Sequence, residues 1–259
     1  MSMNEANVTA EAHNRVPVVN AEFWLIKLMA VTVGETAADY LAVNLGYGLS
    51  ATSWIMTAVL AVVIVLQFAQ RRYVPWAYWL AVVMVSVVGT LITDNMVDNL
   101  GIRLETSTVF FTVALMAAFA VWYASEKTLS IQTIFTLRRE IFYWIAILLT
   151  FALGTASGDL VSETLGMGYF LTGVIFGAII LAIAGAYFAG KMDGTLAFWM
   201  IYIFTRPLGA SIGDYLSQPT EYGGLGLGTI VTSWMFLGTI AATVIWLTFG
   251  RQRRVSLVG

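Results

Sequence analysis

Residues 23–39 read FWLIKLMAVTVGETAAD, and the skeleton of this stretch returns three more times along the chain. In each copy an aromatic residue precedes a tryptophan, a glycine follows ten residues after the tryptophan, and an aspartate follows after fifteen. The tryptophans are Trp24, Trp79, Trp144 and Trp199, the glycines Gly34, Gly89, Gly154 and Gly209, and the aspartates Asp39, Asp94, Asp159 and Asp214. Four matches without gaps indicate a protein built from tandem repeats.

Further landmarks extend each repeat beyond its aspartate. A Leu-Gly pair follows in every copy, as Leu45-Gly46, Leu100-Gly101, Leu165-Gly166 and, displaced by a five-residue insertion around residues 218–223, Leu225-Gly226. Thr52-Ser53-Trp54 recurs as Thr232-Ser233-Trp234 with the same displacement. We therefore predict one membrane domain made of a polar tail (1–20), four repeats (21–73, 74–130, 138–192 and 193–250) and a basic tail (251–259).

The composition is that of a membrane protein. Hydrophobic residues make up 59% of the 259 residues and charged residues 11%, whereas soluble domains carry about 25% charged residues. Each repeat contains two apolar stretches long enough to cross the hydrocarbon core as a helix. We predict an all-α protein with eight transmembrane helices, near 22–43, 51–69, 76–97, 107–124, 141–162, 169–189, 195–216 and 229–249.

The basic residues predict the orientation of these helices. They are concentrated in the even-numbered connections and the C-terminal tail: Arg71, Arg72, Lys127, Arg138, Arg139, Lys191, Arg251, Arg253 and Arg254. Because such residues favour the cytoplasmic side, both termini are predicted to be cytoplasmic. Every repeat has two spans, so all four point the same way, with pseudo-symmetry about the membrane normal.

The four Phe/Tyr-Trp pairs and the four Gly-x4-Asp segments resemble those of a bacterial inner-membrane family of unknown function. That family is defined by four tandem repeats of two spans, each with a characteristic tryptophan. The resemblance covers residues from about 20 to 250. It implies a multi-pass protein of the bacterial inner membrane, of the transporter or channel kind, and implies no substrate and no site.

Ionisable residues inside the predicted spans are the candidates for function. Seven carboxylates lie on the first helix of a repeat: Glu35, Asp39, Asp94, Asp98, Asp159, Glu163 and Asp214. Six of them form pairs four residues apart, which places both members on one helix face. Arg206 is the only arginine within a span, and it can neutralise only one carboxylate. A bound cation or protons would have to offset the rest.

The side chains that could coordinate a metal ion narrow the choice of ion. The chain has no cysteine, and its single histidine, His13, lies in the N-terminal tail, so thiolate and histidine metal sites are excluded. Carboxylate oxygens suit hard cations such as Mg²⁺, Ca²⁺ and Mn²⁺. We therefore expect a transporter or exporter of such a cation, coupled to protons, with Asp39, Asp94, Asp159 and Asp214 as metal ligands.

Other interpretations of these carboxylates and of the function remain open. They are a passive cation channel, an intramembrane enzyme resembling the aspartyl proteases, a non-transporting scaffold, and carboxylates that are merely hydrated or protonated between helices. We expect no covalent cofactor and no catalytic activity. The expected partners are the lipid bilayer and a small cation or protons; a net charge of −2 offers no face for nucleic acid, and a homo-oligomer is compatible with the sequence. The repeat tryptophans are expected to anchor the helices at the membrane interface.

Overall fold

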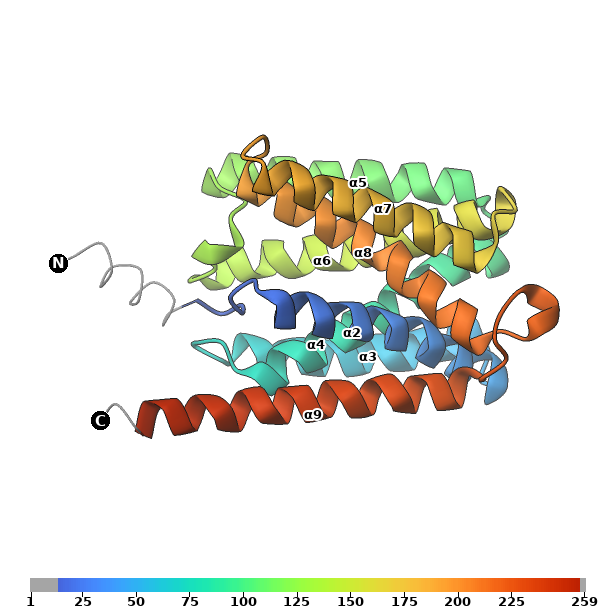
Figure 1. The fold of residues 1–259 in the computed structure, drawn as a ribbon, viewed down its shortest axis with the longest axis horizontal. Coiled ribbons are helices and arrows are strands. Elements are labelled where there is room, and N and C mark those ends of the chain that lie inside the picture. The colour runs from blue at the N-terminus through green and yellow to red at the C-terminus, as the bar shows by residue number, and fades with distance from the viewer. Residues whose placement is uncertain (1–13, 257–259) are drawn as a thin grey trace.

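The computed structural model describes residues 14–256, and within that range all regular secondary structure is helical (Figure 1). Residues 1–13 and 257–259 of the two predicted tails lie outside it. Eight long helices run along one direction in the described part: α2 (Ala21–Asp39), α3 (Leu49–Phe68), α4 (Pro75–Asp94), α5 (Leu104–Glu126), α6 (Leu137–Asp159), α7 (Gly168–Phe188), α8 (Gly194–Ser217) and α9 (Thr229–Ser256).

Seven of these helices, α3 to α9, are long and apolar enough to cross a membrane. The exception among the eight predicted spans is α2, which carries Glu22, Lys27, Glu35 and Asp39. Lys27 and Glu35 are buried, so packing against the other helices shields much of this charge. The helices are those expected of a multi-pass membrane protein.

The helices form two shells. The first helices of the repeats, α2, α4, α6 and α8, make a closed inner ring in which each contacts the next and α8 contacts α2. Each second helix packs mainly on the inner helix of the following repeat: α3 on α4, α5 on α6, and α7 on α8. The last helix, α9, packs on α2 and completes the circle. The outer helices bury only 17–22% of their apolar stretch inside the protein, so most of this apolar surface faces outward.

The repeat glycines are the contact points of the inner ring. A Cβ on Gly34 would lie 2.4 Å from Cβ of Ser86, one on Gly89 2.7 Å from Cβ of Phe151, and one on Gly209 2.4 Å from Cγ1 of Val31. The fourth contact joins Gly154 to Arg206. In every case the partner stands seven residues after the tryptophan of the next repeat. The glycines thus let neighbouring helices approach closely, in the same way four times around the ring.

The expectation that the repeat tryptophans anchor the helices at the interface is wrong for three of the four. Trp79, Trp144 and Trp199 are 2–5% exposed, and only Trp24 is partly buried. They lie near the starts of the inner helices, where aromatic rings of neighbouring inner helices pack on them and α5 also contacts Trp199. Together with the preceding Phe23, Tyr78, Tyr143 and Phe198 they form a continuous network of ring contacts. These aromatic side chains pack inward, and not at the membrane interface, because other helices surround the inner helices.

Three inner helices end in a wider, π-helical turn directly after the repeat aspartate. These turns span Tyr40–Asn44, Asn95–Asn99 and Leu160–Thr164. The glycine of each Leu-Gly pair then adopts a left-handed conformation, with φ between +66° and +72° at Gly46, Gly101 and Gly166. Gly226 has the same φ of +72°, which supports the placement of the fourth, displaced pair. In α8 the insertion replaces the π-helical turn with a short 3₁₀ turn, Thr220–Tyr222.

Candidate functional site

The inner helices stack their side chains in layers inside the ring. Residues three, seven and eleven positions after each repeat tryptophan are spaced four apart and so share a helix face. The layers are Lys27, Val82, Ile147 and Tyr202; then Val31, Ser86, Phe151 and Arg206; then Glu35, Thr90, Thr155 and Ala210. All twelve side chains are buried. The four repeat aspartates form the next layer.

Arg206 joins the inner helices at the centre of this stack. Its side chain comes from α8 and is 1% exposed. Nη2 donates to Oε2 of Glu35 on α2 at 2.7 Å, to Oγ1 of Thr155 on α6 at 2.7 Å, and to the hydroxyl of Thr90 on α4. Thr90 in turn donates to Oε2 of Glu35 at 3.3 Å. One guanidinium nitrogen therefore contacts three of the four residues in the next layer, and Pro207 beside it lies within a continuous α8.

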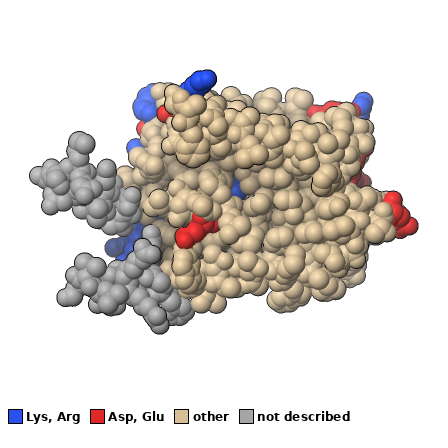
Figure 2. All heavy atoms as spheres, in the orientation of Figure 1, with Lys and Arg blue, Asp and Glu red and all other residues tan. Residues whose placement is uncertain are grey.

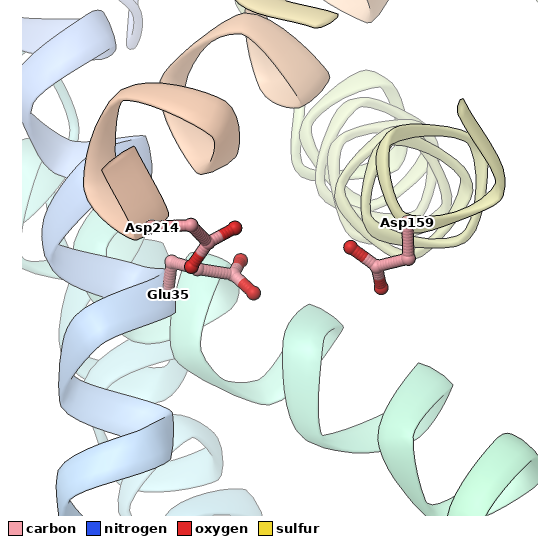
Figure 3. A group of neighbouring side chains, drawn as sticks. All are labelled: Glu35, Asp159 and Asp214. Atoms are coloured by element: carbon pink, nitrogen blue, oxygen red, sulfur yellow. The ribbon is translucent and has the colours of Figure 1, made fainter. Parts of the chain in front are cut away.

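Three carboxylates converge beside this contact. One oxygen each from Glu35, Asp159 and Asp214 can be chosen so that all three lie within 4.8 Å of one another. They come from α2, α6 and α8, and Figure 3 shows Glu35 and Asp214 together with Asp159 facing them across the gap. Glu35 and Asp214 are buried, and Asp159 is partly buried. The carboxylates of Asp159 and Asp214 form no hydrogen bond or ion pair with any residue between 14 and 248.

The remaining predicted carboxylates lie around this group but outside it. Asp39 and Asp94 are partly buried in the same layer as Asp159 and Asp214, and neither belongs to the close group. Asp98 and Glu163, one turn further on, are exposed. Exposure thus decreases step by step from Asp98 and Glu163, through the aspartate layer, to Glu35. The exposed members of the set therefore lie at the outer end of this gradient and Glu35 at its buried end.

Beyond Arg206 in the other direction lies a second buried cation, which the sequence reasoning did not select. Lys27 is fully buried; Nζ donates to the carbonyl of Tyr202 at 2.6 Å and lies 4.0 Å from the centre of the Tyr202 ring. It forms no ion pair with a carboxylate among the described residues. Phe151 separates the two cations, with Nζ of Lys27 5.8 Å and Cζ of Arg206 5.7 Å from its ring centre.

Lys27, Thr90 and Thr155 were missed although the signal was present. They occupy the positions three and eleven residues after a repeat tryptophan, on the helix face that carries the aspartates. Counting back every fourth residue from each repeat aspartate would have found all three. The sequence alone could not have shown that Arg206 reaches Thr90 and Thr155.

The aromatic layer closes the other end of the axis. The hydroxyls of Tyr78 and Tyr143 hydrogen-bond to each other at 2.5 Å, and both side chains are fully buried. Phe198 and Tyr202 pack against Phe23 across the ring. Side chains therefore fill the axis from the tryptophans to Arg206, whereas carboxylates surround it beyond.

Comparison with known proteins agrees with this repeated architecture. No curated protein and no solved structure matches the chain. A family model described as a repeat of unknown function (DUF347) matches four times, at residues 23–73, 77–128, 142–192 and 197–253. These segments follow one another through most of the chain, each covering one inner and one outer helix. The chain belongs to the family built from this repeat, DUF347.

Proposed function

We propose that this protein is a multi-pass transporter of a hard divalent cation in a bacterial inner membrane, with Glu35, Asp159 and Asp214 as the ligands of the ion. The observation that carries the proposal is the convergence of these three carboxylates from three helices far apart in the chain. Buried carboxylates without partners are costly unless a proton or a cation compensates them. Asp214, 8% exposed, is such a group.

The spacing suits an ion of the size of Ca²⁺. Oxygen ligands lie about 2.3–2.6 Å from Ca²⁺, so ligands on opposite sides are separated by about 4.6–5.2 Å. The oxygens of the three carboxylates lie within 4.8 Å of one another, which an ion of this size can bridge without large rearrangement. Mg²⁺, with ligands at about 2.0–2.1 Å, would need the group to contract or keep some of its water.

The closed aromatic end favours a transporter over an open channel. A continuous pore would need a path through the layers of Lys27 and Arg206, and all eight side chains of these layers are buried. A cation entering past Asp98 and Glu163 reaches the carboxylates and stops. Release to the other side then requires the four repeats to rearrange, as in proteins that expose a fixed site alternately to each side.

The distribution of basic residues supports a cytoplasmic location for the closed end. Figure 2 shows lysine and arginine side chains mainly at the end of the bundle where the even-numbered connections lie. The segment that leads into α2 and the last turn of α9 lie at that same end (Figure 1), so both termini would be cytoplasmic. The carboxylates then face the outer side of the membrane.

Cation binding to the purified protein tests the proposal. We expect Ca²⁺ or Mn²⁺ to raise the unfolding temperature in detergent, since a ligand at 100 times its Kd adds about 2.7 kcal/mol to the stability of the folded state. Asp159→Asn should lose this response. Asp193→Asn is the matched control, because Asp193 is an exposed helix cap that asparagine can replace. Equal stabilisation of Asp159→Asn and the native protein would contradict the proposal, as would the absence of any response to divalent cations.

A further inference from the structure

Arg206 occupies a position that is uncharged in the other three repeats. Seven residues after the tryptophan the chain has Val31, Ser86 and Phe151, and in the fourth repeat Arg206. Gly154 leaves room for it: a Cβ there would lie 2.1 Å from Cγ of the arginine. The fourth repeat thus introduces one positive charge at the centre of an otherwise similar ring.

The carboxylate of Glu35 belongs to two groups at once. Its Oε2 accepts from Arg206 at 2.7 Å, and its carboxylate is also a member of the close group with Asp159 and Asp214. A cation bound to that group would therefore share Glu35 with the guanidinium. Arg206 also keeps Nε and Nη1 buried without a hydrogen-bond partner within residues 14–248. The charge of the guanidinium is thus only partly compensated and repels a cation that binds to the neighbouring carboxylates.

We propose that Arg206 is a built-in counter-ion that competes with the transported cation for Glu35 and so lowers the affinity of the site to a level that permits release. The inference rests on the proposed function and names the residue that sets its affinity. Three carboxylates and one guanidinium carry a formal charge of −2, which a divalent cation neutralises. Without the arginine the group carries −3 and holds the same ion more tightly, because like charges at this distance repel strongly in a dry environment.

The Thr90 and Thr155 hydroxyls hold Arg206 in place during this exchange. Both accept from Nη2, and both are fully buried. When the cation draws Glu35 away, the guanidinium keeps these two acceptors and does not need to leave the ring. The arginine therefore competes without being displaced, which is what a reversible site requires.

Titration of the detergent-purified full-length protein with Mn²⁺ and with Ca²⁺, followed by calorimetry, tests the inference. Arg206→Gln should bind the ion at least about tenfold more tightly than the native protein. Arg206→Lys, which keeps the charge, should stay close to the native affinity. Arg103→Gln is the control, because Arg103 is exposed and pairs only with its neighbour Glu105. Unchanged or weaker binding by a folded Arg206→Gln variant would overturn the inference and leave the proposed function standing.

A second comparison keeps the test open if Arg206→Gln does not fold. Glu35→Gln/Arg206→Gln removes both charges of the buried pair, so neither partner is left alone. It should bind the divalent ion more tightly than Glu35→Gln, in which the arginine still faces Asp159 and Asp214. Equal affinity of these two variants would overturn the inference. Failure of the native protein and of every variant to bind either ion would overturn the proposed function together with it.

Discussion

Gly154 of α6 and Arg206 of α8 fit so closely that a single methyl group cannot be placed between them. A Cβ on Gly154 would lie 2.1 Å from Cγ and 2.4 Å from Cβ of the arginine. Equivalent contacts at Gly34, Gly89 and Gly209 join the other inner helices. Gly154 therefore both brings α6 and α8 together and makes room for Arg206, the only charged residue of the layer Val31, Ser86, Phe151 and Arg206.

Substitution of this glycine should destabilise the fold. We expect Gly154→Ala to lower the free energy of unfolding by about 1–3 kcal/mol, the usual cost of overpacking a close contact. Thermal unfolding in detergent measures it. Gly185→Ala in α7 is the control, since no atom lies within 4 Å of its added Cβ and alanine favours a helix. Similar unfolding temperatures for the two variants would show that the close approach is relaxed in solution.

The Tyr78–Tyr143 hydrogen bond should behave as a coupled pair. Tyr78→Phe or Tyr143→Phe leaves the other hydroxyl buried without its 2.5 Å partner, at a cost of about 1–3 kcal/mol. Removing both hydroxyls leaves no orphaned group, so the double variant should cost less than the two single variants together. A double-mutant cycle on chemical unfolding measures this coupling, and additive effects would contradict it.

Arg15 should be needed to hold the start of α6. Its Nη1 contacts the fully buried Glu140 at 2.6 Å, and Gln67 donates to the other carboxylate oxygen. Arg15→Met leaves that charge buried with only the amide, which typically costs about 3–5 kcal/mol. We expect a large fall in unfolding temperature, measured against Arg103→Gln, whose exposed ion pair should matter little. A small effect would mean that Glu140 is protonated or hydrated.

Substitution of a buried tryptophan should lower the stability far more than substitution of an exposed one. Trp79→Ala removes a side chain that is 2% exposed and donates to the hydroxyl of Tyr73 at 3.1 Å, and should cost about 3–5 kcal/mol. Trp54→Ala removes an outward-facing side chain, 79% exposed, and should change the unfolding temperature little. Equal effects would restore the interface-anchor interpretation of the repeat tryptophans.

Ion flux should depend on the aspartate layer. We expect Asp159→Asn and Asp94→Asn to abolish divalent-cation uptake into proteoliposomes while expression and folding stay intact. Asp159 is a proposed ligand, and Asp94 is the corresponding aspartate of the second repeat in the same layer. The exposed Asp193→Asn provides the matched control. Normal flux in both aspartate variants would contradict the hypothesis that the cation passes through this layer.

The candidate site was predicted in part. The seven carboxylates and Arg206 could be selected because charge within an apolar helix is costly wherever the helix packs. Which of them converge could not: Glu35, and not Asp39 or Asp94, joins Asp159 and Asp214. That choice depends on the relative rotation and height of three helices, and helix periodicity does not contain this information.

The sequence by itself determined the four repeats, the two helices in each and the regular position of their glycines, because span length, hydropathy and residue spacing are local properties. Only the tertiary structure decided that each outer helix packs on the next repeat, that α9 returns to α2, and that the tryptophans face inward. It also decided that Arg206 meets Glu35, Thr90 and Thr155. These contacts join residues 51 to 171 positions apart, and their geometry arises from packing all eight helices at once.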